Sequence, residues 1–419
     1  VILGIKFGLR WHDNIVLKVV GLSLAILTSL YSTKWLLELS FAGPLLTVVL
    51  LSFLILGGPI FLVLGGLSWA LFSIENIPMA ALALSHYQIT VNPSLPALPL
   101  FTLAGLIFAN SQAAQRLSQL FIAAFGTGQI GTVFAVACLC SCFTALTGGS
   151  GVTILALGGL MLPLLLKANY PESKSIGLIT SASSLGVLLA PSVPLIMYAI
   201  IAKVPINTMF VAGIVPAVLM IFSLVIFGGF LNTRNKGILE INQGPVQILP
   251  GFTNRPSFKQ AFWNSKWELL APLIAVGSLI SGFATPTEGA ALTVVYALLT
   301  QGLVHRELKW ANFQVCLMQT AQIIGGILLI MGMALGITNY LIDVGIPDLA
   351  SDWVQSITSN KYVFLLALNI FLFFAGALME IYAAIIVLVP LLLPLAMSYG
   401  IDPIHFGIIF LANLEMGFL

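Results

Sequence analysis

The sequence predicts an all-α polytopic membrane protein. Three observations carry this prediction: the composition, a long series of apolar segments, and the small-residue breaks within those segments. Of the 419 residues, 59% are hydrophobic and only 7% are charged, whereas a soluble domain carries about 25% charged residues. Such a chain cannot cover a water-facing surface of ordinary size, so the lipid bilayer must be most of its solvent. The net charge of +2 gives no reason to expect nucleic acid as a partner.

A helix that spans a bilayer needs about 20 mostly apolar residues. Several apolar segments of this chain are shorter, and Gly, Pro, Ser or Thr bound them rather than charged loops. This pattern predicts re-entrant hairpins and broken helices, because non-helical backbone at membrane depth must be satisfied by protein or by a wet cavity. The candidate segments are 15–31, 44–73, 97–110, 117–125, 130–146, 151–166, 175–202, 209–231, 268–283, 286–303, 314–340, 361–378, 380–397 and 404–419.

Two basic stretches set the expected orientation. Residues 232–267 hold five basic residues against one glutamate, and residues 305–309 hold the next basic cluster. The chain between them is long enough for two short crossings, so both stretches should face one compartment. The positive-inside rule makes that compartment the cytoplasm. The turn at 284–288 then faces the opposite side or the protein interior.

The chain contains two similar halves. Residues 160–166 resemble residues 387–393, and each segment follows a small-residue break and precedes a polar turn and a glycine-containing helix. A second alignment pairs Pro163 with Pro394, and it fits the glycines better and the leucines less well. Paired interrupted segments predict the binding site of a secondary transporter. The second half stops two residues after Gly417, so we expect its equivalent of the 190–194 break to lie beyond Leu419.

The strongest break covers residues 147–153, Thr-Gly-Gly-Ser-Gly-Val-Thr. Half-helix ends expose unpaired carbonyls and amides, so carbonyls and hydroxyls here could ligate Na⁺ while a helix N-terminus holds an anionic group. The alternative is a small-residue packing face, but consecutive glycines do not make one helix face. A second break lies at 190–194, where Pro191 and Pro194 must interrupt the helix; a packed proline kink is the alternative.

Ionisable residues inside apolar segments are costly and are functional by default. Glu380 follows the break at Gly376, and Glu415 lies in the last helix. For both, structural hydrogen bonding and ion coupling remain open. For Glu288, after the proline of its turn, we favour a capping role at the start of the next helix.

Enzyme functions are not favoured. Gly148-Gly149-Ser150-Gly151 superficially matches the nucleophile motif of intramembrane serine proteases, but no histidine is placed to serve as the base. No phosphate-cradling glycine loop is present. Cys138, Cys140 and Cys142 have no accompanying histidine or carboxylate, so we expect small core residues there rather than metal ligands.

Four motifs in order resemble the large membrane subunit of the TRAP (tripartite ATP-independent periplasmic) transporters, over roughly residues 45–419. The first is the 147–153 tip with its continuation to Pro163, and the second is residues 185–194. The third is residues 284–298, which begin Ala-Thr-Pro-Thr-Glu-Gly-Ala-Ala. The most specific match is the end of the chain, from Pro390 to Gly417.

The resemblance implies a secondary transporter in the bacterial inner membrane. Members of the family import small organic acids, such as C4-dicarboxylates or sialic acid, by Na⁺ symport. They receive the substrate from a soluble periplasmic binding protein, and a small four-helix membrane subunit accompanies the large one. The family resemblance also implies inverted repeats, two re-entrant hairpins and an elevator-type motion. No organic cofactor is expected.

Three departures from the family pattern matter. The first tip is usually richer in serine, so Gly149 and Gly151 shift ion ligation toward backbone carbonyls. The second tip usually carries Asp-Pro-Thr after its methionine, whereas here it reads Glu380-Ile381-Tyr382, which puts a second sodium site in doubt. The third departure is that the sequence ends at Leu419, before the position where the family has its final Thr-Pro-Pro break.

The predicted organisation is an N-terminal helix within residues 1–44, which could be the tail or linker of a fused small subunit, and a transport region over 45–419. That region comprises the first hairpin and broken helix (97–202), scaffold helices with the basic loop (203–313), and the second hairpin repeat (314–419). The predicted Na⁺ ligands are Thr147, Gly148, Gly149, Ser150, Gly186, Pro191, Gly376 and Glu380. The predicted substrate contacts are Ser150, Gly151, Ser192 and Ala377. The alternative function is a binding-protein-independent anion:cation symporter of similar hairpin architecture, and a channel is a third class.

Overall fold

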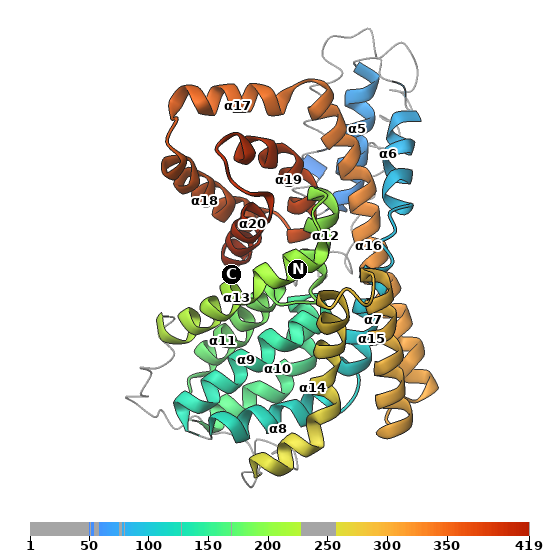
Figure 1. The fold of residues 1–419 in the computed structure, drawn as a ribbon, viewed down its shortest axis with the longest axis vertical. Helices are drawn as coiled ribbons and strands as arrows, with labels where there is room; N and C mark the ends of the chain where they lie inside the picture. The colour runs from blue at the N-terminus through green and yellow to red at the C-terminus, as the bar shows by residue number, and fades with distance from the viewer. Residues whose placement is uncertain are drawn as a thin grey trace. The chain divides into compact units, whose positions relative to one another are not determined.

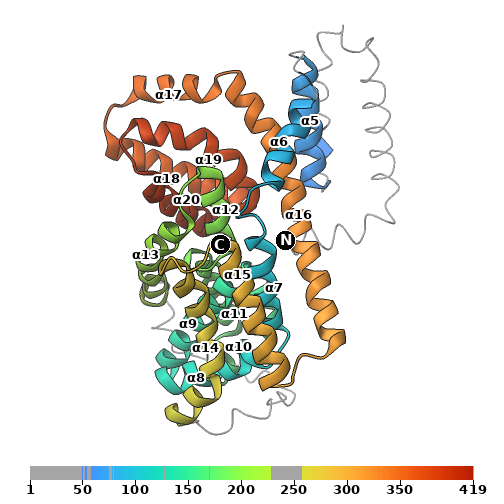
Figure 2. The same cartoon turned by 45° about the vertical axis from the view of Figure 1, so that its right-hand side comes forward.

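The computed structural model describes residues 50, 52–53, 58–74, 78, 80–126, 128–168, 170–227 and 257–418 (Figures 1 and 2). All regular secondary structure within these residues is helical. Eight of the described helices are long and apolar enough to cross a membrane, and a bent pair would add a ninth. The predicted all-α polytopic fold is confirmed. The helix at 15–31, all of residues 1–44 and most of the basic loop 232–267 lie outside the described residues.

The chain divides into two compact units. The described part of the first unit contains α5 (Ile60–Ile74), α6 (Ala80–Thr90), the second half of α16 (Trp310–Asp343) and α17 (Ile346–Ile357). It also takes in the middle of α19. Helix α5 lies close to α16, because the buried Ser68 hydroxyl donates a hydrogen bond to the Met333 carbonyl oxygen at 3.1 Å. No residue of α17 is buried.

In the second unit, α7 (Ala97–Ala109) and α8 (Ala113–Phe125) meet at a bend of 74°. Helix α7 packs against α15 (Pro286–Leu298), and α8 packs against α14 (Phe258–Ile280). Helices α14 and α15 form a hairpin, which a π-helical turn extends through Leu299–Val304. The Tyr296 hydroxyl donates a hydrogen bond to the Trp267 carbonyl at 2.7 Å, so the last turns of α15 lie beside the middle of α14.

The turn between α14 and α15 ends in a capping box. The Thr285 side chain accepts a hydrogen bond from the Glu288 amide, and the Glu288 carboxylate accepts one from the Thr285 amide at 2.8 Å. Two free amides at the start of α15 are thereby satisfied. The predicted capping role of Glu288 is confirmed.

The first hairpin and its broken helix follow α8. The hairpin consists of α9 (Gln129–Thr147) and α10 (Ser150–Lys167). The broken helix consists of α11 (Glu172–Leu185), a 3₁₀ turn (Gly186–Leu188) and α12 (Val193–Ala202), and α13 (Ile206–Phe227) comes next. Helices α9, α10 and α11 pack side by side (Figure 1) around fully buried Phe143, Leu157 and Leu178.

The second hairpin consists of α18 (Lys361–Leu378) and α19 (Ile381–Ser398), and α20 (Pro403–Phe418) follows it. Helices α18 and α20 pack closely, because glycines stand at their contact. A Cβ atom on Gly417 would lie 2.2 Å from the Phe373 carbonyl oxygen, and one on Gly376 would lie 2.6 Å from the Leu414 oxygen. Such close backbone approach is typical of membrane helices.

The two hairpins repeat at a constant spacing of 231 residues. Helix α10 spans residues 150–167 and α19 spans residues 381–398, and the preceding helices end at residues 147 and 378. The following helices begin at residues 172 and 403. The same spacing pairs Gly186 with Gly417 and Pro163 with Pro394. The structure therefore supports the alignment that fits the glycines.

Candidate functional site

The tip of the first hairpin is a two-residue break formed by Gly148 and Gly149. Gly148 adopts a left-handed conformation with φ of +74° and caps α9 through a 2.8 Å hydrogen bond to the Thr144 carbonyl. A Cβ atom there would also lie 2.4 Å from Val193 Cγ2. Gly149 is extended, and α10 then starts at Ser150. The sequence folds this way because glycine alone combines a left-handed φ with the close approach of α12.

Three threonine hydroxyls gather beneath this tip. The Thr144 hydroxyl donates to Thr153 at 2.8 Å, and the Thr147 and Thr153 hydroxyl oxygens lie 2.9 Å apart. The Thr147 and Thr153 hydroxyl oxygens each also lie 3.4 Å from the Gly149 carbonyl oxygen. All three side chains are buried. Thr147 was a named candidate ligand and Thr153 lay within the predicted 147–153 break, whereas Thr144 was not predicted, although it lies only one helical turn before the tip.

Ser150 and Gly151 begin α10 at the outer side of the tip. Ser150 is half-buried, and Gly151 is exposed. A Cβ atom on Gly151 would meet no atom within 4 Å. Of the predicted substrate contacts in the first hairpin, these two therefore border open space.

The broken helix meets the first hairpin beside the threonine cluster. A Cβ atom on Gly186 would lie 2.2 Å from the Ser141 carbonyl oxygen and 2.6 Å from Thr144 Cβ, so glycine is required at this contact. Ser192 is fully buried, and its hydroxyl donates a hydrogen bond to the Val187 carbonyl. Ser192 thus closes the break between the 3₁₀ turn and α12, and its predicted contact with substrate remains a prediction.

The second tip differs in chemistry. Helix α18 ends with a 2.8 Å hydrogen bond from the Met379 amide to the Ala375 carbonyl, and Glu380 is the N-cap of α19. The Glu380 carboxylate lies near the first free amides of α19, those of Tyr382 and Ala383, without a capping hydrogen bond of good geometry. Ala377 is exposed at the end of α18.

The two tips are joined by one side chain. The Tyr382 hydroxyl donates a hydrogen bond to the Gly148 carbonyl oxygen at 2.7 Å. Tyr382 is 9% exposed. The structure thus joins the first tip to the second through a tyrosine that sequence reasoning treated only as a departure from a family pattern.

Glu415 lies in the last turn of α20 and is 4% exposed. The described cationic residues on α18 and α20 are Lys361 and His405, and each stands in the first turn of its helix. Since α18 and α20 approach each other at the Gly376–Leu414 contact, neither cation is placed to neutralise this carboxylate. An unpaired charge at such a position would be costly, so both readings of Glu415, structural hydrogen bonding and ion coupling, stay predictions.

The fold and these paired breaks define a class, the polytopic α-helical permeases with a duplicated hairpin and an interrupted helix. The family model for the "Tripartite ATP-independent periplasmic transporter, DctM component" matches residues 47–419. The chain therefore belongs to the large permease family of the TRAP transporters, as the sequence motifs predicted. It is a multi-pass inner-membrane protein.

Curated relatives agree with this assignment. The isethionate TRAP transporter permease protein DctMQ of Oleidesulfovibrio alaskensis is 30% identical over 88% of this chain, which spans 56% of that protein. The C4-dicarboxylate large permease DctM of Pseudomonas aeruginosa is 30% identical, with 85% of this chain and 80% of the relative covered. The sialic acid large permease SiaM of Vibrio cholerae is 31% identical, with 78% and 74% covered.

Proposed function

We propose that the chain is the transport subunit of a Na⁺-driven symporter that imports a small organic acid. The observation that carries this proposal is the meeting of the two equivalent hairpin tips at the hydrogen bond from Tyr382 to the Gly148 carbonyl. Paired interrupted segments at corresponding positions are the places where secondary transporters bind substrate and coupling ions. The relatives named for isethionate, C4-dicarboxylates and sialic acid support a carboxylate or similar acid as substrate.

In this proposal the first tip holds one Na⁺ ion. Na⁺ is a hard cation, and the donors gathered at this tip are backbone carbonyls and hydroxyls, without soft ligands. The Gly148 and Gly149 carbonyls and the Thr147 hydroxyl are the nearest candidates, with Gly186 and Pro191 in the facing break. Ser150 and Gly151 border open space at the N-terminus of α10, where the helix dipole favours the acid group of a substrate.

The second tip, with Gly376 and Glu380, contributes the other side of the site. At the second tip, Glu415 supports an alternative coupling ion, a proton in place of a second Na⁺. Within the residues that the structure describes, this carboxylate is 4% exposed and forms no ion pair, so it would be stable only when protonated or when it ligates a cation.

We further propose that a soluble periplasmic binding protein delivers the substrate and that a small four-helix subunit accompanies this chain. The tripartite family description and the relative named DctMQ support these partners. Re-entrant hairpins, an inverted repeat and an elevator motion complete the proposal. The equal lengths of α10 and α19 and the constant spacing of 231 residues support a duplicated unit.

The test is uptake into proteoliposomes that contain the large and small subunits, with the binding protein outside. Labelled isethionate, a C4-dicarboxylate and sialic acid serve as probes, under separately imposed Na⁺ and H⁺ gradients. We expect saturable uptake driven by the Na⁺ gradient. Uptake that follows H⁺ alone would refute the sodium site at the first tip. Full uptake without the binding protein would favour the independent symporter, and non-saturating currents would indicate a channel.

A further inference from the structure

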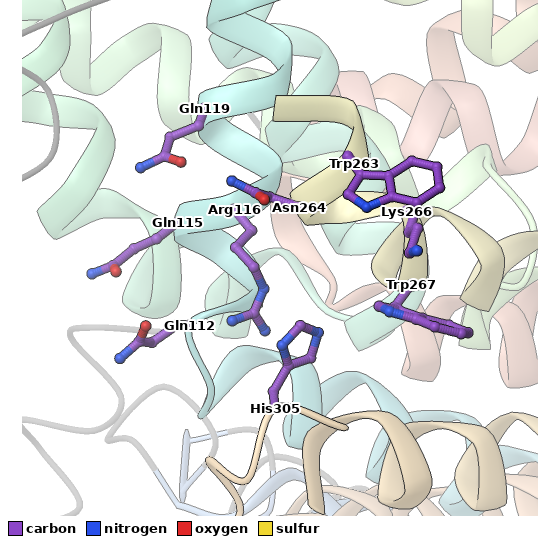
Figure 3. Close-up of a pocket in the computed structure, with 9 residues that line it drawn as sticks. All are labelled: Gln112, Gln115, Arg116, Gln119, Trp263, Asn264, Lys266, Trp267 and His305. Carbon is purple, nitrogen blue, oxygen red and sulfur yellow. The ribbon is translucent and has the colours of Figure 1, made fainter. Parts of the chain in front are cut away.

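A cavity of about 480 Å³ lies between α8, α14 and the segment after α15 (Figure 3). None of the hairpin-tip residues lines it. Helix α8 and its N-cap contribute three glutamines and Arg116, while α14 contributes two tryptophans, an asparagine and Lys266. His305 closes the cavity from the third side. The lining is therefore amide-rich and cationic, and it contains no carboxylate.

Arg116 is a fixed part of the wall rather than a free charge. Its Nε atom donates to Glu268 Oε1 at 2.7 Å, and its Nη1 atom donates to Glu307 Oε1 at 2.5 Å. Burial alone would raise the pKa of the Glu307 carboxyl, but hydrogen bonds from Arg116 and the Gln112 amide, with the charges of Arg116 and His305, hold that pKa below its ordinary value. Two carboxylates thus already neutralise the guanidinium.

Lys266 is the cation that remains for a ligand. Its Nζ atom lies 3.7 Å from the ring centroid of Trp263 and 5.1 Å from that of Trp267. It forms no ion pair with any carboxylate in the part of the chain that the structure describes. Stacking against two indoles holds the ammonium group in place beside the cavity.

His305 supplies a second unused donor site. Its Nε2 atom lies 3.3 Å from Glu268 Oε1, an ion-pair distance if the ring is protonated, and this buried nitrogen has no hydrogen-bond partner among the described residues. Buried polar atoms are normally satisfied. A ligand oxygen in the cavity would satisfy it.

The surface beside the cavity is suited to a lipid. The first turns of α14 expose Phe258, Phe262 and Trp263, the last of which is 66% exposed. Aromatic side chains of this kind gather at membrane–water interfaces. The positive-inside expectation places this end of α14 at the cytoplasmic leaflet.

We propose that this cavity binds the headgroup of an anionic phosphodiester lipid with a hydroxylated headgroup, such as phosphatidylglycerol. One phosphodiester charge matches the one unpaired ammonium of Lys266, and His305 donates to the same phosphate. The carboxamides hydrogen-bond the headgroup hydroxyls, and the acyl chains run beside Trp263. Basic pockets between membrane helices on the cytoplasmic side are known to bind acidic headgroups.

The test uses the full chain purified with its small subunit in mild detergent. Native mass spectrometry measures how much phosphatidylglycerol is retained in competition with phosphatidylcholine. We expect Lys266→Gln to lower the retained phosphatidylglycerol about fivefold, the usual effect of one basic side chain near an anionic lipid surface. Lys259→Gln is the matched control, because Lys259 is an exposed lysine two turns earlier in α14 that does not line the cavity.

A second variant, Gln115→Leu, covers the case in which Lys266→Gln does not fold. Gln115 is an exposed helical residue that lines the cavity, so its loss should lower the preference for phosphatidylglycerol without unfolding α8. Equal retention of both lipids, or equal losses in the Lys266 and Lys259 variants, would overturn the proposal. Displacement of the lipid by soluble glycerophosphoglycerol at similar concentration would show a site for a soluble phosphodiester, which also overturns a lipid site.

Discussion

The two hairpin tips share a backbone register but not a chemistry. The first tip has a left-handed glycine, the backbone carbonyls of Gly148 and Gly149, and three buried threonine hydroxyls. All of these groups are neutral. The second tip has no left-handed residue, and it offers a carboxylate and a tyrosine. The spacing of 231 residues is the same at both tips, so the difference lies in the backbone conformation of Gly148 and Met379 and in the side chains around them. It suggests that the duplicated scaffold holds two sites of different charge, one suited to Na⁺ and one to Na⁺ or a proton.

The largest effect is expected from Gly148→Ala. Alanine at a left-handed φ costs about 1–2 kcal/mol, and the clash with Val193 adds a similar amount. We expect a strongly lowered thermal unfolding midpoint and loss of Na⁺-driven uptake. At the second tip, the equivalent Met379→Ala should be mild. Gly151→Ala is the control within the first tip, because its Cβ atom would meet nothing.

Glu415→Gln tests the charge of the second site. The amide keeps the shape of the side chain, so the protein should fold and reach the membrane. We expect uptake to fall at least tenfold in proteoliposomes if the carboxylate carries a coupling ion. Na⁺- and H⁺-driven uptake are then compared for the variant. Unchanged uptake under both gradients would leave Glu415 with a structural role only.

Tyr382→Phe separates the two tips. The change removes one hydrogen bond, worth about 1 kcal/mol, and we expect the Na⁺ half-saturation concentration for uptake to shift about fivefold. Tyr399→Phe is the matched control, because the Tyr399 hydroxyl donates to the Thr358 carbonyl at 2.6 Å, at the end of the second hairpin far from its tip. An equal shift in both variants would argue against a direct link between Tyr382 and the ion site.

Thr153→Val tests the neutral donors of the first tip. Valine keeps the shape but leaves the Thr144 and Thr147 hydroxyls without a shared partner, so the free energy of unfolding should fall by about 1 kcal/mol. Na⁺ affinity should fall with it. At the second tip the equivalent residue is Ala384, where Ala384→Val tests packing alone and should leave the Na⁺ half-saturation unchanged.

The smallest expected effect is on the pH dependence of stability. It compares α8 and α17, the helices that lead into the two hairpins. Helix α8 is tied down by Arg116, Glu268 and Glu307, whereas α17 has no buried residue. The pKa of Glu307 is lowered in the folded protein. Its contribution to stability is therefore present above its unfolded pKa, near 4.5, and is lost as pH falls through the lower folded value.

Thermal unfolding between pH 3 and pH 6 checks this dependence. We expect Glu307→Gln to flatten the acid end of the profile by a small amount. Asp348→Gln in the exposed helix α17 is the control and should leave the profile unchanged. A profile for Glu307→Gln that matches the unmodified protein would contradict the role of the ion network.

Much of this architecture could be predicted from the sequence. Gly148, Gly149 and Pro191 predict breaks because the conformational preferences of glycine and proline act on their own backbone, whatever the tertiary structure. The structure has breaks at those positions. The repeat was detectable for the same reason, although the leucine alignment competed with the glycine alignment. The constant helix spacing in the structure decided for the glycine alignment. Gly186 and Gly417, which it pairs, each lie where an added Cβ atom would clash with a backbone carbonyl oxygen of another helix.

The contacts between distant segments could not be predicted in this way. Tyr382 and Gly148, which share a hydrogen bond, are 234 residues apart in the sequence. No local sequence pattern predicts such a pair. The threonine cluster and the cavity beside Lys266 likewise depend on how helices pack in three dimensions. The membrane depth of the tips and the coupling ion remain predictions, because composition and backbone breaks set neither.

The hydrogen bond from Tyr382 bears on how fast an ion could leave. A carbonyl oxygen has two lone pairs, and the tyrosine occupies one of those on Gly148. The oxygen would then be a weaker electrostatic partner for a cation, with less density free to donate. A transporter that bound its ion too tightly would stall at the step of release. At the Na⁺ site proposed above, the phenol would therefore shorten the residence time of the ion on this oxygen.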